Sequence, residues 1–252
     1  MRPASVIFAC TVTLLLAAAA SAQPQRTVRF SGYDWEVRQT GKGGPGPNQW
    51  DPANVRVDKN GWLHLNITKV RNEWRCAELS TTKRLGFGRY EFQVMGRIDR
   101  FDPTVVLGLF NYTTPDIGPD GTNEIDIEIA RWGNPKWDNG SFTIYPSKGE
   151  RITQDDHHTF AFALTGDDTT QRFAWSGSQV AFEVLQGRGG GASEPLAGAQ
   201  WVYAPHDLRL IPQQPLPVHI NLWLFRGKPP ADQKGIEVVV KQFTFVPLHL
   251  LR

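Results

Sequence analysis

Hydrophobic and polar residues alternate along most of the chain, and no segment after residue 22 sustains the apolar period of a helix. Turn-forming motifs such as DKNG, PDGTN, GNPKWDNG and TGDD separate the alternating segments. Short strands joined by turns at this spacing predict an all-β protein, either a sandwich or a barrel. The predicted strands lie at residues 61–69, 88–96, 104–112, 140–146, 158–164, 171–177, 217–225 and 236–245.

Two glycine-rich segments, residues 42–52 and 187–198, interrupt the alternation and are predicted to be loops. Neither ends in the Lys-Ser/Thr pair of a phosphate-binding loop. Neither changes the composition for long enough to mark a domain boundary. We therefore expect residues 23–252 to form a single domain.

The first 22 residues have the pattern of a secretory signal peptide. Arg2 precedes an apolar run at residues 6–20, and Ala20-Ser21-Ala22 provides a small-x-small cleavage site. The run is short for a transmembrane helix, which makes an uncleaved anchor the weaker alternative. The pattern predicts a bacterial protein that is secreted or periplasmic, with no membrane contact after cleavage.

Charge and cysteine content exclude several classes of protein. Removal of Arg2 leaves 26 basic and 25 acidic residues, so nothing favours binding to nucleic acid or to an anionic membrane. Only Cys76 remains after cleavage, which excludes an internal disulfide. Cys76 lies in an alternating apolar stretch and is expected to be a buried thiol.

The segment TNEIDIEIARWG, from Thr122 to Gly133, has acidic residues at alternate positions. Residues two apart share one face of a strand, so Glu124, Asp126 and Glu128 project together while isoleucines enter the core. The Cα atoms of Glu124 and Glu128 are roughly 13 Å apart at a rise of about 3.3 Å per residue. Side chains that lean together bring the carboxyls to about 5–5.5 Å, the separation found in retaining glycosidases.

Crowding affects how these carboxyls ionise. Three neighbouring acids do not all lose their protons easily, so at least one pKa rises. A raised pKa suits a general acid near neutral pH, whereas a carboxylate suits a nucleophile. The alternative is an exposed acidic strand face, but acids are depleted in strands and crowded like charges cost stability. The pattern therefore favours a catalytic site.

The motif EIDIE at residues 124–128 resembles the E-x-D-x-E signature of glycoside hydrolase family 16. The resemblance is strongest to bacterial licheninases and covers roughly residues 50–225. It implies a concanavalin-like jelly-roll β-sandwich, with two antiparallel sheets and a concave substrate cleft. The further segments that carry it, in the same order, are WRCAELSTTKRLGFGRYEF (74–92), LFNYTTP (109–115), HTFAFAL (158–164) and INLWLF (220–225).

The resemblance also implies catalytic roles. Glu124 would be the nucleophile that forms a glycosyl-enzyme intermediate, Glu128 the acid/base, and Asp126 the residue that holds and tunes the pair. The uninterrupted spacing is typical of enzymes acting on β-1,3-1,4- or other 1,4-linked glucans, because laminarinase-type members carry one extra bulge residue. We expect an endo-acting β-glycosidase that is monomeric, binds a polysaccharide and needs no cofactor.

Substrate-binding residues follow from the same resemblance. Aromatic rings suit the C–H faces of sugars, although each aromatic residue has an alternative place in the core. Trp132 and Trp137 follow the acids and are further candidates for the cleft lining, but RWGNPKW does not match the licheninase continuation. The candidates for stacking are Phe110, Tyr112, Tyr145 and Trp223, and those for hydrogen bonding are Glu78 and Asn221.

Several positions depart from the licheninase pattern. Thr-Asn at residues 122–123 replaces Trp-Asp, and Ser80 replaces a substrate-binding arginine. The cysteine that would pair with Cys76 is replaced near Asn48, and Lys241 replaces an acidic calcium ligand. These differences argue against the disulfide and the calcium site, and they leave the exact glucan open.

The same residues also bear on other possible functions. A transglycosylase would use the same acids, so spacing does not separate it from a hydrolase. A non-catalytic glycan-binding module normally lacks one of the acids, and all of them are present. The absence of a G-x-S-x-G motif excludes a serine hydrolase elbow. The DDHH run at residues 155–158 does not suit a metal, because neighbouring strand residues point to opposite faces.

Overall fold

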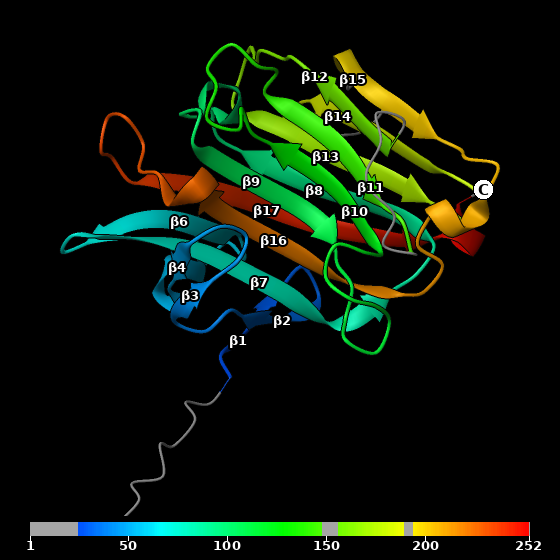
Figure 1. Cartoon of the computed structure of the whole chain (residues 1–252), viewed down its shortest axis with the longest axis horizontal. Helices are drawn as coiled ribbons and strands as arrows, with labels where there is room; N and C mark the ends of the chain where they lie inside the picture. The colour runs from blue at the N-terminus through cyan, green and yellow to red at the C-terminus, as the bar shows by residue number, and fades with distance from the viewer. Residues whose placement is uncertain (1–24, 148–155, 189–193, 252) are drawn as a thin grey trace, which may run out of the picture.

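The computed structural model describes residues 25–147, 156–188 and 194–251, and the expected signal peptide lies outside this part of the chain. Its regular structure consists of strands and short 3-10 helices, which confirms the all-β prediction. Among the described residues, no helix is long and apolar enough to cross a membrane. The strands form two curved layers packed on each other (Figure 1).

The inner layer is an antiparallel sheet whose long strands β7, β16, β9 and β10 lie side by side (Figure 1). In order of pairing it consists of β1 (Thr27–Phe30), β2 (Tyr33–Val37), β7 (Glu73–Leu85), β16 (Leu216–Leu224), β9 (Val105–Asn111), β10 (Glu124–Ile129), β11 (Gly140–Tyr145) and β12 (His157–Phe160).

The outer layer is also antiparallel and backs the inner one. In order of pairing it consists of β5 (Val55–Val57), β6 (Leu63–Val70), β17 (Ile236–Pro247), β8 (Gly88–Met95), β13 (Asp168–Trp175), β14 (Val180–Gln186) and β15 (Pro195–Tyr203).

Short elements join the two layers at one end. β4 (Asn48–Trp50) pairs with β3 (Gly41–Gly43) and, in parallel, with β7, whose other edge there contacts β6. The 3-10 helices are η1 (Pro52–Asn54), η2 (Ile98–Arg100), η4 (Leu208–Leu210), η5 (Phe225–Gly227) and η6 (Leu248–Leu250).

The core lies between the layers and is rich in aromatic side chains. Phe142 of β11 stacks with Phe182 of β14 at 4.8 Å between ring centroids. Trp35 of β2 meets Phe243 of β17 edge-on at 5.6 Å. The isoleucines of β10 are completely buried in this core. One face of the inner sheet therefore packs against the outer sheet, and the polar residues of the inner sheet must lie on its other face.

The predicted alternating segments coincide with β6, β8, β9, β11, β12, β13, β16 and β17, with small shifts of their ends. The largest shift is at β12, which ends at Phe160 because the Asn139 side chain bonds both backbone groups of Phe162. The loop predictions were wrong in part. Residues 42–52 include β4 and the end of β3, and residues 187–198 include the start of β15. Neither stretch alternates strongly enough to signal a strand.

Candidate active site

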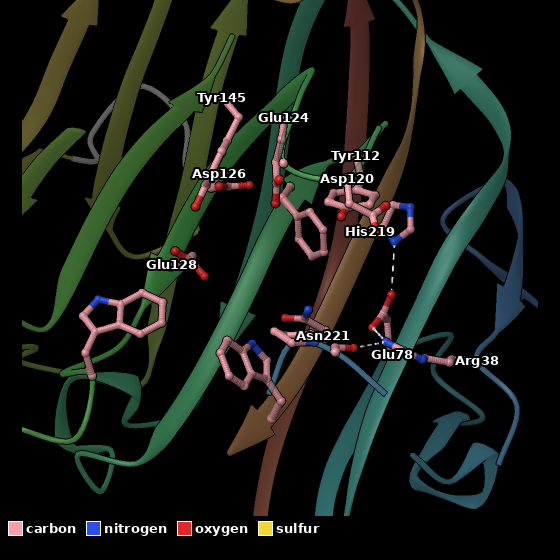
Figure 2. A pocket seen from close by; sticks show the side chains of 16 residues that line it. Arg38, Glu78, Tyr112, Asp120, Glu124, Asp126, Glu128, Tyr145, His219 and Asn221 are labelled. Carbon is pink, nitrogen blue, oxygen red and sulfur yellow. Dashed lines mark hydrogen bonds and ion pairs between the residues drawn. The ribbon is translucent and has the colours of Figure 1, made fainter. Parts of the chain in front are cut away.

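The acidic residues of β10 lie on the face of the inner sheet away from the core. Asp126 is 4% exposed, and Glu124 and Glu128 are partly exposed. The predicted face assignment is confirmed, since the isoleucines between them are completely buried. All three carboxyls point into one pocket (Figure 2).

Cross-strand pairing arranges the neighbours of these acids in rows. One row passes from Glu128 of β10 to Gly108 of β9, then to Asn221 of β16 and Glu78 of β7. The parallel row one step along passes from Asp126 to Phe110, His219 and Ser80, and Glu124 lies opposite Tyr145 of β11. Residues distant in sequence thus meet because each alternates onto the same face of its strand.

The rows form the floor of a cleft with a volume of 530 Å³, within the range of ligand-binding sites. Its lining residues come from β7, β9, β10, β11 and β16, and from the segments after β2, after β3, after β9 and on either side of β10 (Figure 2). The lining residues are Arg38, Gly44, Pro45, Glu78, Phe110, Tyr112, Asp120, Gly121, Glu124, Asp126, Glu128, Trp132, Tyr145, His219, Asn221 and Trp223.

The pKa values of all three carboxyls on β10 are raised. Burial, followed by repulsion from Glu128, raises the pKa of Glu124 to about 8. Burial raises the pKa of Glu128 to about 7. Burial and the two flanking glutamates raise the pKa of Asp126 well above its usual range. The cluster therefore retains protons at neutral pH, as expected from the crowding of acids.

Asp126 is placed to control the ionisation of Glu124. A hydrogen bond between the two carboxyls lowers the pKa of Glu124 and raises that of Asp126. This contact favours the proton on Asp126 and offsets part of the burial and repulsion that raise the pKa of Glu124. The Oδ1 atom of Asp126 is buried and has no hydrogen-bond partner among the described residues, so it remains available inside the cleft.

A separate carboxylate, Glu78, is neutralised by basic groups on either side. The Arg38 guanidinium donates to its Oε2 at 2.7 Å, and the His219 ring nitrogen Nδ1 lies 3.3 Å from its Oε1 (Figure 2). Burial alone would raise the pKa of Glu78, but His219 and Arg38 outweigh it and lower the pKa. Glu78 is therefore a fixed hydrogen-bond acceptor and not a proton donor.

Aromatic rings flank the acids on the cleft surface. Phe110 and Tyr112 meet edge-on at 6.0 Å between centroids, and both pack against His219. Burial, with the negative charges of Glu124 and Asp120, raises the pKa of Tyr112 to about 12, so its hydroxyl stays protonated. Phe110 is 8% exposed, so little of its ring is open to the cleft.

The structure brings all nine residues selected from the sequence to this cleft: Glu78, Phe110, Tyr112, Glu124, Asp126, Glu128, Tyr145, Asn221 and Trp223. Trp132 also lines it, whereas Trp137 lines a neighbouring groove. The sequence reasoning missed Arg38, Asp120 and His219. The licheninase pattern has an arginine at the position of Ser80. In this chain Arg38 supplies a guanidinium instead, and it bonds Glu78.

Asn48 takes the place of a disulfide partner for Cys76, as the sequence predicted. The Cys76 thiol donates to the Oδ1 atom of Asn48 at 3.4 Å, and the thiol is completely buried. Burial raises the pKa of Cys76 to about 12. A thiol in this environment is unreactive.

The residues around Lys241 do not fit the calcium ion that the resemblance suggested there. The Lys241 ammonium is itself a cation and donates to the Oδ1 atom of Asp168 at 2.7 Å. Arg188 bonds the other oxygen of the same carboxylate at 2.9 Å. Ca²⁺ requires several oxygen ligands, and this carboxylate already has two basic partners. Within the described residues, no group of three or more His, Cys, Asp or Glu side chains suits a metal ion.

Comparison by sequence finds no family model and no curated protein that matches the chain. Solved structures do match it. A β-1,3-1,4-glucanase (lichenase) derived from a mouse hindgut metagenome superposes with a TM-score of 0.61 at 21% identity, covering 85% of this chain and 93% of that one. The Bacillus licheniformis β-glucanase gives a TM-score of 0.61 at 20% identity, with 89% and 99% covered.

A third structural match is described as an immunostimulatory antigen and pseudo β-1,3-glucanase of Mycobacterium tuberculosis. It has a TM-score of 0.59 at 20% identity and covers 85% of this chain and 91% of that chain. At identities this low, the structural matches show a shared architecture and nothing finer. They confirm the jelly-roll β-sandwich expected from the sequence motifs. The chain has the lichenase-type fold of the β-glucanases.

Proposed function

We propose that this protein is a glycoside hydrolase of family 16, a secreted, endo-acting retaining β-glycosidase that cleaves a β-glucan. The observation that carries the proposal is the cluster of Glu124, Asp126 and Glu128 on one strand, inside the cleft of a glucanase-type fold. A match whose description reads pseudo β-1,3-glucanase has the same fold, so the fold alone does not decide activity. The acids do.

The proposed reaction is a double displacement that needs no cofactor. Glu124, as carboxylate, attacks the anomeric carbon while Glu128 donates its proton to the departing glycosidic oxygen. Glu128 then removes a proton from water, which releases the sugar from Glu124. Asp126, as the proton donor in its contact with Glu124, favours the ionised form of that glutamate. The two glutamates titrate as a coupled pair, so their pKa values do not decide which is the nucleophile. The roles rest on position in the motif and on the contact with Asp126.

The chemistry of the cleft supports a neutral sugar polymer as substrate. Glu78, Asp120 and the acids of β10 face only Arg38 and His219 as basic partners, and Arg38 is already paired. An anionic polysaccharide would meet net repulsion there. Tyr112, Tyr145 and Trp223 offer aromatic surfaces for sugar rings, and Asn221 offers an amide. We propose a β-1,3-1,4- or other β-glucan, bound by a monomer outside the bacterial cytoplasm.

The test is release of reducing ends by the protein lacking residues 1–22. Mixed-linkage β-glucan, xyloglucan, laminarin and a galactan serve as substrates, and Glu124→Gln is assayed in parallel with circular dichroism as the folding control. Release from a β-glucan that is lost in the folded variant supports the proposal. Equal release by wild type and variant would refute it. Binding without release, even with added acceptor oligosaccharides, would identify a binding module. Release of rearranged products only with acceptors would identify a transglycosylase.

A further inference from the structure

We propose that the groove beside Trp132 and Trp137 is a second sugar-binding site, which holds the substrate chain on the side of β10 opposite Glu78. It has a volume of 400 Å³. Trp132 lines both this groove and the main cleft, so the two lie on either side of one side chain. The inference rests on the proposed function, because the occupant is the same β-glucan chain. The groove is lined by Trp132, Lys136, Trp137, Asp138, Gly140, His157 and Thr159.

Position relative to the acids is the first argument. The main cleft extends from β10 over β9 and β16 to Glu78 on β7. The groove includes Gly140 of β11 and both His157 and Thr159 of β12, on the other side of β10. A polymer cleaved in mid-chain extends away from the acids in both directions. The groove lies where the second half of such a chain would leave the catalytic residues.

Exposure of an aromatic ring is the second argument. Trp137 is 55% exposed, and it is the one aromatic ring among the exposed large hydrophobic side chains of the described residues. A ring left in solvent beside a groove is a surface for stacking against the C–H face of a sugar. Hydroxyl groups of the same sugar would find donors and acceptors on Lys136, Asp138 and Thr159.

Trp132 has a backbone conformation that orients its ring toward both sites. Its φ angle is +51°, in the left-handed region that bulky side chains rarely adopt. Its ring lies 6.1 Å from that of Trp223 and 5.6 Å from that of Phe225. Such conformations cluster where a side chain must be held for binding, because the surrounding structure has to stabilise them.

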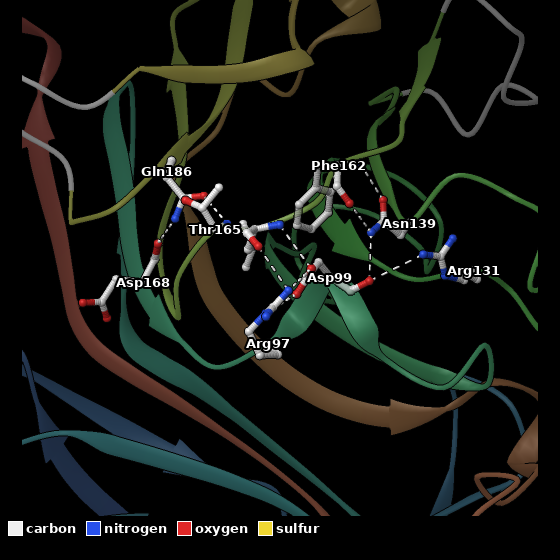
Figure 3. A network of polar contacts seen from close by, with 9 residues as sticks. Arg97, Asp99, Arg131, Asn139, Phe162, Thr165, Asp168 and Gln186 are labelled. Carbon is white, nitrogen blue, oxygen red and sulfur yellow. Dashed lines mark hydrogen bonds and ion pairs between the residues drawn. The ribbon is translucent and has the colours of Figure 1, made fainter.

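The loop that carries both tryptophans is held rigid by a network of hydrogen bonds. The Arg131 guanidinium donates to the carbonyl oxygen of Trp137 at 2.7 Å. It also donates to the carbonyl oxygen of Asp99 at 3.5 Å (Figure 3). Asn139 donates to the same Asp99 carbonyl at 3.2 Å, and the backbone N–H of Gly133 bonds Pro103 at 2.7 Å. Ordering this loop on binding therefore costs little entropy, as in a preformed site.

Chain-length dependence tests the groove. Steady-state kinetics on β-glucan oligosaccharides of increasing length compare wild type with Trp137→Ala, with Trp137→Phe, and with Trp62→Ala as the matched control. Trp62 is partly buried near Lys241 on the outer layer and lines neither site. We expect Trp137→Ala to raise KM roughly fivefold to tenfold for long oligosaccharides and to leave short ones unchanged, with partial rescue by Trp137→Phe. Equal KM values at every length would overturn the inference.

A binding measurement separates this inference from the proposed function. In the Glu124→Gln background, titration calorimetry compares polymer affinity with and without Trp137→Ala. Weaker binding in the double variant supports the groove even if wild type hydrolyses nothing, in which case only the catalytic proposal fails. Equal affinities, or no binding by either protein, would overturn the groove whatever the hydrolysis assay shows.

Discussion

The amide oxygen of Asn221 accepts a hydrogen bond from the backbone N–H of Gly108 at 3.1 Å, in the space that a side chain at residue 108 would occupy. A Cβ atom built on Gly108 would lie 2.5 Å from that oxygen, closer than van der Waals contact permits. Gly108 is also the cross-strand neighbour of Glu128. The missing side chain on β9 therefore lets Asn221 reach toward the proposed acid/base.

Substitution of Gly108 by alanine should displace Asn221 and reduce kcat/KM by roughly 10- to 100-fold, because small misplacements at a reacting centre are costly. Gly41→Ala is the matched control, since its Cβ would meet nothing within 4 Å. Kinetics and thermal unfolding should be measured on both proteins. A folded Gly108→Ala variant with wild-type kcat/KM would show that the position of Asn221 does not matter.

Glu128→Gln should affect substrates according to their leaving groups. An aryl glycoside with a very good leaving group needs little protonation, whereas natural glucan needs the proton from residue 128. The expected loss on glucan exceeds that on the activated substrate by about 100-fold or more. Parallel steady-state assays on the two substrates give the ratio. Equal losses on both would contradict the acid role.

The pH profile of kcat/KM should be bell-shaped and centred between about 7 and about 8, the raised pKa values of Glu128 and Glu124. At lower pH both glutamates are protonated and the nucleophile is lost. At higher pH both are ionised and the proton donor is lost.

A matched profile with Glu128→Gln on the activated substrate identifies the limbs. In wild type the two limbs belong to the glutamate pair. With residue 128 uncharged, Glu124 titrates alone, so the variant should keep an acidic limb, shifted to lower pH because repulsion from Glu128 is lost, and should lose the alkaline limb. An unchanged alkaline limb would place the titrating acid elsewhere.

Glu124→Gln should be more stable than wild type at alkaline pH. The raised pKa means that the folded protein binds more protons than the unfolded chain between about 4.5 and about 8. Stability therefore falls as pH rises through this window, and glutamine does not titrate. We expect a Tm higher by about 3–6 °C at pH 8.5 and equal at pH 4. Glu36→Gln is the control, since Glu36 is an exposed carboxylate on β2. A similar gain there would attribute the effect to net charge.

Asn48→Cys should form a disulfide with Cys76, because the two side chains already touch. The expected gain in unfolding free energy is about 2–4 kcal/mol. Thiol titration of the oxidised variant should find no free thiol after denaturation, whereas wild type should yield one only when unfolded. A free thiol in the denatured variant would show that the backbone geometry does not permit the bond.

Local alternation predicted the part of the site that lies on strands. The acids of β10 and the pair Phe110 and Tyr112 each occupy positions two apart on one strand, so a short segment contains the information. His219 shares the same signal, because it alternates with Asn221 and Trp223 along β16, and the period could have identified it.

Other cleft residues depend on contacts between distant segments. Arg38 follows β2 and reaches the site because its backbone N–H bonds the carbonyl oxygen of Glu78 at 2.9 Å. Asp120 lies in the loop before β10, where no periodicity applies. No local pattern near either residue indicates which strand it will meet, and sequence reasoning could not place them. The boundary of β12 was missed for the same reason, since Asn139, in the bend just before β11, ends it.

The two faces of β10 differ so completely that the strand cannot pair one residue out of register. A slip by one residue would turn every side chain over, exposing Ile125, Ile127 and Ile129 while driving the carboxyls between the layers. Unpaired charges in that interior would be far more costly than any misplaced apolar residue. The acids proposed for catalysis thus also destabilise, during folding, any sheet in which β10 is shifted by an odd number of residues.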